Sequence, residues 1–297
     1  MGGYFGGMLA RAGAPVAMIG RPAFVERVNR SGLFLDTTSF QESVKVEAST
    51  EMQAAADADI VLFCVKSTDT VAAATELAGV IRRDAVVVCL QNGVDNADKV
   101  RAASGINALP AVVYIACTME EPGRIKHNGR GDLVLGLDDE QTRRVAALFE
   151  RAGVPCRISD NMRGELWAKL LWNCALNAIS AVGRVRYGRI AENSEARTMV
   201  EDVAREFLAV ARAERVVLPG VPDHEAGLAG AMKIATQMSA AFSSTAQDLF
   251  RGKRTEIDSL NGYIVQRGRE LGVPTPVNHA LWTLVKLAET GQAGAVA

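Results

Sequence analysis

Residues 59–67 read Asp-Ile-Val-Leu-Phe-Cys-Val-Lys-Ser, and no polar residue interrupts the run between Ile60 and Val65. A strand with one face in water alternates apolar and polar residues. An unbroken apolar strand is instead covered on both faces, as in parallel sheets flanked by helices. The stretch therefore predicts a buried parallel strand with polar residues, Lys66 and Ser67, at its carboxyl end.

Three more short apolar runs of this kind occur in the first half of the chain, at residues 16–19, 85–90 and 111–116. Helical patterns lie between them, for example from Thr70 to Ile81. Such an alternation of strands and helices is typical of a doubly wound parallel sheet of the Rossmann type. We therefore expect an α/β fold in this half.

The pattern changes after Glu120. Asn-Gly-Arg-Gly at 128–131 separates two strand-like runs and predicts a hairpin. From about Asp160 onward the periodicity is helical, with helices expected at 165–182, 194–214, 233–250, 256–271 and after the Gly-Val-Pro-Thr-Pro segment at 272–276. We predict a Rossmann-type domain over 1–160 and an all-α domain over 161–297.

The composition of the chain argues against several classes of function and so limits those that we expect. The chain has 297 residues, which fits two domains, and 33 basic against 34 acidic residues give a net charge of −1. No excess of one sign exists to bind nucleic acid or an anionic membrane surface, and no apolar run is long enough to span a bilayer. The five cysteines form no CxxC pair and the three histidines are scattered, so we expect reduced thiols, a cytoplasmic location and no metal.

The glycine-rich start, Gly-Gly-Tyr-Phe-Gly-Gly at 2–7, predicts the first helix of a dinucleotide-binding unit, in which Gly2 is the third glycine of GxGxxG. The strand and the two glycines that should precede it are missing. Either Met1 is an internal methionine with about ten residues upstream, or the chain starts here and binds its cofactor poorly. We favour the first explanation. A helix that is merely rich in small residues remains the alternative.

Polar residues follow three of the expected strands. Arg21 follows the strand at 16–19, where an arginine suits the 2′-phosphate of NADP and an acid would suit NAD. Lys66 and Asn92 end the next two strands, where parallel sheets bind ligands. We predict that Gly2, Arg21, Lys66 and Asn92 bind NADP, and that Asn92 also meets the substrate. The structural alternatives are a surface loop, a solvated charge and an Asn-Gly turn.

Lys169, Asn173 and Asn177 are spaced i, i+4 and i+8, so they form one polar stripe on an otherwise apolar helix. Such a stripe must face solvent or find polar partners, and periodicity alone favours neither.

Several of these segments, taken together, resemble the signature segments of the ketopantoate reductase (2-dehydropantoate 2-reductase) family. They are residues 2–7, 65–67, 91–94, 165–170 with Asn173 and Asn177, 244–248 and 255–258. The resemblance runs in order from Gly2 to about Lys286. The departure from the family pattern is the absent first strand with its two glycines.

The resemblance implies NADPH-dependent reduction of 2-dehydropantoate to (R)-pantoate, in pantothenate and coenzyme A synthesis. It implies that Lys169 is the general acid and that Asn173 and Asn177, facing the cleft, bind the carboxylate or hydroxyl end of the substrate. Ser244 would contact the carboxylate, and Glu256 would bind a hydroxyl as part of the catalytic set. Ser244 and Glu256 lie 12 residues apart, about 120° off one helical stripe, so periodicity does not pair them.

Two other functions remain open. The chain could reduce a different 2-oxo acid with NAD(P), or it could be a cofactor-deficient paralogue that is not an enzyme. A small 2-oxo acid is the expected partner, and the long apolar helices of the second half are compatible with a homodimer.

Overall fold

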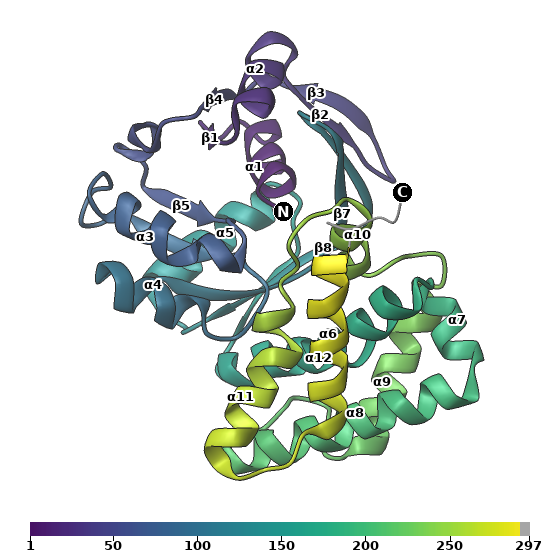
Figure 1. Cartoon of the computed structure of the whole chain (residues 1–297). Helices are drawn as coiled ribbons and strands as arrows, with labels where there is room; N and C mark the ends of the chain where they lie inside the picture. Colours follow the sequence, from purple (N-terminus) through teal and green to yellow (C-terminus); the bar gives the residue numbers. More distant parts are fainter. Residues whose placement is uncertain (292–297) are drawn as a thin grey trace. The chain divides into compact units, whose positions relative to one another are not determined.

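A computed structural model describes residues 1–291 of the chain. It divides into two compact units, with the boundary between Met162 and Arg163. The first unit contains the strands and the second is helical (Figure 1).

The sheets of the first unit confirm the doubly wound α/β class. The strands are β1 Ala17–Ile19, β2 Leu33–Asp36, β3 Gln41–Val44, β4 Glu47–Ser49, β5 Ile60–Phe63, β6 Val86–Cys89, β7 Leu109–Glu121, β8 Arg124–Gly136 and β9 Cys156–Ser159. The larger sheet has the order β3-β2-β8-β7-β6-β5, with β9 also paired to β8, while β1 and β4 form a separate parallel pair. The neighbours β5, β6 and β7 are parallel, whereas β2–β3 and β7–β8 are antiparallel.

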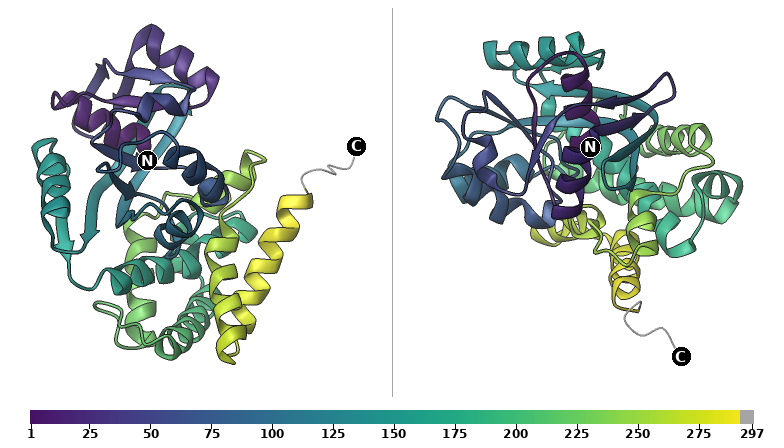
Figure 2. Two further views of the ribbon diagram at one scale, coloured as in Figure 1. Left: turned by 90° about the vertical axis from the view of Figure 1, so that its left-hand side faces the viewer. Right: turned by 90° about the horizontal axis from the view of Figure 1, so that it is seen from above.

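The helices of this unit are α1 Gly2–Arg11, α2 Pro22–Ser31, α3 Thr70–Ala78, α4 Asn96–Ser104 and α5 Glu140–Arg151, with short 3₁₀ turns at Met52–Ala55 and Ser67–Asp69. Helix α1 lies against the strands (Figures 1 and 2) because its glycines allow close approach. A Cβ atom on Gly7 would lie 2.8 Å from Leu33 Cδ2 and 2.9 Å from Leu35 Cδ2, and one on Gly6 would lie 2.8 Å from Met18 Cε.

Strands β1 and β5, which lie next to helix α1, each pair on one side only among residues 1–291. Strand β1 pairs with β4 alone, and β5, at the end of the larger sheet, pairs with β6 alone. Helix α1 packs against both, since Gly6 meets Met18 on β1 and Gly2 meets Cys64 just after β5. The two open edges lie where a Rossmann sheet has its first strand, the strand that the sequence lacks.

The hairpin predicted at residues 128–131 is wrong. Residues Arg124–Gly136 form one long strand, β8, and the chain reverses instead at Pro122-Gly123, where Gly123 has a φ of 75°. Gly129, Arg130 and Gly131 do have positive φ, but they make β-bulges in a ladder that stays paired with β7. The glycines bend the strand and do not end it.

The second unit contains α6 Met162–Gly183, α7 Tyr187–Glu192, α8 Ser194–Ala213, α9 His224–Gln237, α10 Ser244–Phe250, α11 Asn261–Leu271 and α12 Pro276–Gly291, with a 3₁₀ turn at Ile257–Ser259. Helices at 165–182 and 194–214 were predicted from the sequence and are confirmed within a few residues as α6 and α8.

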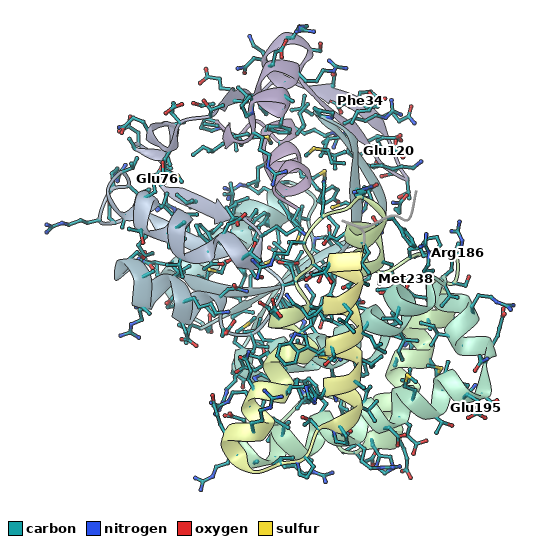
Figure 3. The ribbon with its side chains drawn as sticks, in the orientation of Figure 1. Phe34, Glu76, Glu120, Arg186, Glu195 and Met238 are labelled. Carbon is teal, nitrogen blue, oxygen red and sulfur yellow. The ribbon has the colours of Figure 1, made fainter. Side chains whose placement is uncertain are left out.

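The single helix predicted at 233–250 is wrong, because the chain leaves the helix between Gln237 and Ser244. The backbone carbonyl groups of residues 239–241 in this connection accept hydrogen bonds from residues 186–188. The backbone N–H of Gly188 donates to Ser239 O at 3.0 Å, and that of Tyr187 donates to Ala241 O at 2.9 Å. The Arg186 guanidinium binds Ala240 O (Arg186 and Met238 are labelled in Figure 3). The side chain of Ser243 then caps the new helix through Ala246 N.

The helix predicted at 256–271 begins later, because Leu260 has non-helical backbone angles and α11 starts at Asn261. The Asn261 side chain is buried and donates to Cys174 O on α6 at 3.1 Å and to Asn278 Oδ1 on α12 at 3.0 Å. These bonds fix the start of α11 between two other helices.

Candidate active site

In the first unit, Lys66 and Asn92 follow the carboxyl ends of two neighbouring parallel strands, β5 and β6. The register places Phe63 opposite Cys89, so the two loops leave the sheet at the same edge. The Ser67 hydroxyl donates to Asn92 O at 3.0 Å and ties the loops together. Lys66 and Asn92 are both half-buried. The structure thus brings these two predicted residues together at the edge where α/β sheets bind ligands.

A buried polar network that the sequence did not reveal holds these loops in place. Gln91 Nε2 donates to Val65 O at 3.0 Å and to Thr70 Oγ1 at 2.7 Å, while Asn96 Nδ2 donates to Asn92 O at 2.6 Å. A buried amide needs such partners, and a network of them gives the backbone a single arrangement. The useful signal was the Gln that precedes Asn92 at the end of an apolar strand.

Gly2 starts helix α1 beside the end of β5. A Cβ atom on Gly2 would lie 3.2 Å from Cys64 Cβ, which is tighter than most packed side chains tolerate, so a larger residue would push the helix start away. The first N–H groups of a helix lack intrahelical acceptors and attract anions. Burial raises the pKa of the adjacent Cys64 thiol to about 11, so the thiol adds no negative charge at neutral pH. These features fit the pyrophosphate of a dinucleotide.

Arg21 lies at the N-cap of α2, two residues after β1 ends. Its side chain is exposed and makes no hydrogen bond or ion pair with any of the described residues. No contact in the structure connects it to Lys66 or Asn92. Its guanidinium is therefore available to an external anion.

In the second unit, helix α6 carries Lys169, Asn173 and Asn177. Lys169 and Asn173 are half-buried, while Asn177 is buried with only 3% of its surface exposed. The stripe is therefore not a fully solvated face. Asn177 Oδ1 accepts a hydrogen bond of 2.7 Å from the hydroxyl of Tyr187 on α7, a residue that sequence reasoning missed.

Ser244 is exposed at the first turn of α10. Its neighbour Ser243 is buried and holds the helix start to α6, because the Ser243 hydroxyl donates to Asn177 O at 3.0 Å. The backbone N–H of Ser243 also donates to Ser180 Oγ at 3.2 Å. Ser244 is thereby fixed near Asn177 through bonds made by the residue before it.

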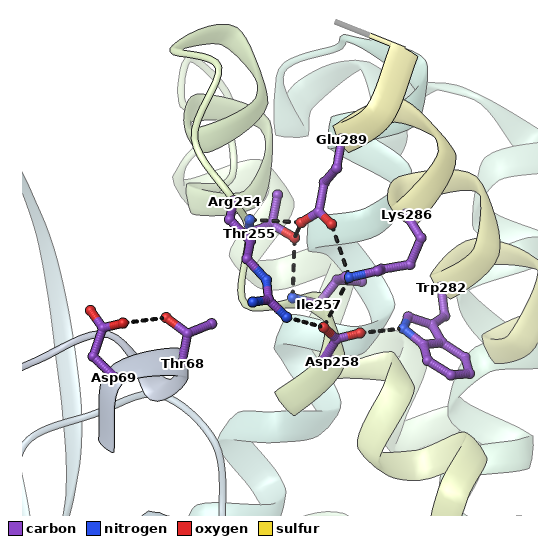
Figure 4. Close-up of polar contacts among 9 residues, drawn as sticks. All are labelled: Thr68, Asp69, Arg254, Thr255, Ile257, Asp258, Trp282, Lys286 and Glu289. Carbon is purple, nitrogen blue, oxygen red and sulfur yellow. Dashed lines mark hydrogen bonds and ion pairs between the residues drawn. The ribbon is translucent and has the colours of Figure 1, made fainter. Parts of the chain in front are cut away.

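Glu256 is half-buried, and its chain neighbours Thr255 and Asp258 both bind side chains of helix α12 (Figure 4 shows these contacts). Before it, the backbone N–H and the hydroxyl of Thr255 both donate to Glu289 Oε1 at 2.7 Å. After it, Asp258 accepts from Trp282 Nε1 at 2.8 Å and from Lys286 Nζ at 3.0 Å. Lys286 also pairs with Glu289 at 3.0 Å, which closes the network.

Residues 1–291 contain neither a candidate membrane-spanning helix nor a candidate metal cluster. No helix there combines the length and apolar character required to cross a membrane. No three His, Cys, Asp or Glu side chains in this part of the chain are grouped as metal ligands would be.

Comparison with known proteins shows the family of this chain. The family described as "Ketopantoate reductase PanE/ApbA" matches residues 1–140, and "Ketopantoate reductase PanE/ApbA C terminal" matches residues 161–289. The chain belongs to the ketopantoate reductase family. It is therefore an oxidoreductase that acts on a CH–OH group with a nicotinamide dinucleotide, as the resemblance of its signature segments implied.

Individual relatives cover nearly the whole ketopantoate reductase chain. A crystal structure of a PanE/ApbA family ketopantoate reductase from Ralstonia eutropha is 49% identical, with a TM-score of 0.91 over 97% of this chain and 95% of that one. The 2-dehydropantoate 2-reductase of Halobacterium salinarum is 32% identical over 97% of this chain and 96% of its own. A complex of D-mandelate dehydrogenase with NADH is 25% identical, with a TM-score of 0.88 over 98% and 96%.

Proposed function

We propose that this chain reduces 2-dehydropantoate to (R)-pantoate with NADPH. The observation that carries the proposal is the stripe on α6, where one ammonium group and two amides, the last of them buried, lie along one line of a mostly apolar helix. Membership of the ketopantoate reductase family and the similarity to proteins named 2-dehydropantoate 2-reductase support this substrate.

Lys169 is the general acid in this proposal. When bound, NADPH supplies the hydride that reaches the ketone carbon. As the carbon–oxygen π bond breaks, negative charge develops on the oxygen, and an ammonium group within hydrogen-bond reach stabilises it and transfers a proton. Lys169 is left as a neutral amine that solvent reprotonates. Lys169 is half-buried on α6, so its ammonium group is held by the helix and is not a freely solvated charge.

The other residues of the second unit bind the substrate. Asn173 and Asn177 meet its carboxylate or hydroxyl end, and Ser244, exposed at the start of α10, contacts the carboxylate. The Glu256 carboxylate accepts a hydrogen bond from the substrate hydroxyl. The α12 network around Thr255 and Asp258 supports this role, because it fixes the backbone on both sides of Glu256.

The cofactor residues lie in the first unit. The start of α1 at Gly2 binds the pyrophosphate, Lys66 and Asn92 bind at the edge of β5 and β6, and Arg21 binds the 2′-phosphate that distinguishes NADPH from NADH. The exposed, unpaired guanidinium of Arg21 supports the last assignment.

Arg21→Ala should raise the Kd of NADPH by about tenfold or more, because a charge-assisted bond to the 2′-phosphate is lost. The Kd of NADH should change little, since NADH has no such phosphate. Titration of nucleotide fluorescence measures both constants. An equal loss for the two nucleotides would contradict the assignment, and Arg27→Ala, another exposed arginine on α2, serves as the control.

A second candidate is the reduction of another 2-oxo acid, favoured by the similarity to D-mandelate dehydrogenase with NADH. The deciding experiment measures kcat/KM for 2-dehydropantoate, unbranched 2-oxo acids and phenylglyoxylate, each with NADPH and NADH. We expect 2-dehydropantoate with NADPH to give the highest value. A preference for an unbranched or aromatic acid would replace the proposed substrate.

A further inference from the structure

The orientation of the Asn177 side-chain amide is fixed by one buried neighbour, Tyr187. Asn177 is 97% buried, yet its amino group donates no hydrogen bond to any of the described residues. Its carbonyl oxygen, in contrast, accepts the 2.7 Å bond from Tyr187. The Asn177 Nδ2 atom is not one of the described side-chain atoms that are fully buried without a partner, so a ligand or water can reach this donor and complete it.

The hydrogen-bond partners available to Tyr187 also decide that its hydroxyl donates to Asn177 Oδ1. The Tyr187 hydroxyl has no other acceptor among the described residues, so turning the amide around would leave a buried O–H without a partner. Burial raises the pKa of Tyr187 well above its ordinary value, so the hydroxyl stays protonated and remains a donor throughout the neutral range. Tyr187 therefore holds the carbonyl side of Asn177 and leaves the amino side available.

The backbone around this pair is also fixed. The Tyr187 N–H donates to Ala241 O at 2.9 Å, and the Ser243 hydroxyl donates to Asn177 O at 3.0 Å. The start of α7, the middle of α6 and the start of α10 are thus joined by hydrogen bonds around one amide. The same bonds fix the backbone of Ser243, the residue directly before Ser244.

We propose that Tyr187 is a positioning residue that turns the amino group of Asn177 toward the substrate, so that position 177 binds a carboxylate oxygen of the 2-oxo acid. The inference rests on the substrate-binding role proposed for Asn177. An N–H group that can only donate matches a carboxylate that can only accept, whereas a substrate hydroxyl is better served by the acceptor Glu256.

Tyr187→Phe removes the hydroxyl and keeps the ring. Without that bond the amide of Asn177 can rotate, and its oxygen can then face the substrate carboxylate. We expect the KM for 2-dehydropantoate to rise by about tenfold, with kcat within about twofold and the KM for NADPH unchanged. If Tyr187 had a purely structural role, Tyr187→Phe would lower the stability of the protein but would not raise the KM for 2-dehydropantoate while leaving kcat unchanged.

The matched control is Thr142→Val, which removes another buried hydroxyl that donates to a carbonyl, Gly136 O at 3.1 Å, in the first unit. This variant should lower the melting temperature without changing the KM for the 2-oxo acid. If Tyr187→Phe remains folded with the wild-type KM, or shifts KM no more than Thr142→Val does, the proposal is overturned.

Two further measurements guard against a variant that simply misfolds. Asn177→Ala and the double variant Tyr187→Phe/Asn177→Ala should show the same KM, because Tyr187 acts through Asn177; additive effects would contradict this. The Tyr187→Phe effect should also persist with trimethylpyruvate, which lacks only the hydroxyl of 2-dehydropantoate. If the effect disappears with this analogue, Asn177 serves the hydroxyl and the carboxylate assignment is wrong.

Wild-type activity separates this proposal from the proposed function. If the wild-type chain does not reduce 2-dehydropantoate, that function fails, and the Tyr187 series is read with the 2-oxo acid that the wild-type chain reduces best. A KM effect on that acid still supports the positioning role, because every 2-oxo acid carries the carboxylate.

Discussion

At the scale of single residues, the proposed reaction depends most on Lys169, its general acid. Lys169→Ala should lower kcat by about 10²- to 10⁴-fold, the usual contribution of a positioned proton donor, while the Kd of NADPH stays nearly constant. Steady-state kinetics and nucleotide titration measure the two quantities. Lys169→Arg keeps the positive charge, but a guanidinium is not deprotonated in proteins and cannot give up a proton, so its kcat should also stay low. Unchanged turnover in Lys169→Ala would remove the general-acid role, and Lys233→Ala, an exposed lysine on α9, is the control.

At the scale of elements, helix α1 depends on its glycines to approach the sheet. Gly7→Ala places a Cβ atom against the fully buried Leu33 and Leu35, so it should destabilise the protein by about 1–3 kcal/mol despite the better helix propensity of alanine. Gly79→Ala at the end of α3 meets its nearest neighbour at an ordinary 3.5 Å and should be close to neutral. Urea unfolding of both variants measures the difference, and equal stabilities would contradict the close packing of α1.

The network between α12 and the Glu256 segment should depend on pH. Burial alone would raise the pKa of Glu289, but the bonds from Thr255 and Lys286 outweigh it and leave the pKa below its ordinary value. Asp258 behaves alike: burial raises its pKa, and the bonds from Trp282 and Lys286 lower it further than burial raises it. Carboxyl groups with lowered pKa stabilise the folded state above their unfolded pKa of about 4, and this stabilisation is lost as the pH falls through the folded value.

Glu289→Gln should therefore lower the melting temperature at pH 7, and its difference from the wild type should shrink as the pH approaches 3. Thermal melts across this range measure the difference. Lys286 and Arg254 are the cations that face these carboxyl groups, and both remain charged throughout the range. Glu192→Gln, in an exposed pair with Arg189, should show little effect at any pH. A Glu289→Gln difference that does not vary with pH would contradict the ionic character of the network.

At the scale of the whole molecule, the sequence predicted what local patterns determine. The strand at β5, the helix α6 and the positions of Lys66 and Asn92 follow from apolar runs and periodicity. The break after Gln237 was missed because its cause is remote: the carbonyl groups there bind residues 186–188. The bulges at 129–131 were mistaken for a turn, since local glycines do not reveal a partner strand. Tyr187 was missed for the same reason, because its role depends on α6 packing beside it.

The open edges of β1 and β5 have a consequence for how this protein behaves in concentrated solution. Strand β5 is Ile-Val-Leu-Phe, and an uncharged strand edge that pairs on one side only can act as a template for another molecule's backbone. We expect light scattering at 37 °C to rise steeply with protein concentration. If scattering does not depend on concentration, these edges are protected. If scattering does rise with concentration, protein concentration more than temperature would determine how long a preparation of this chain stays free of aggregates.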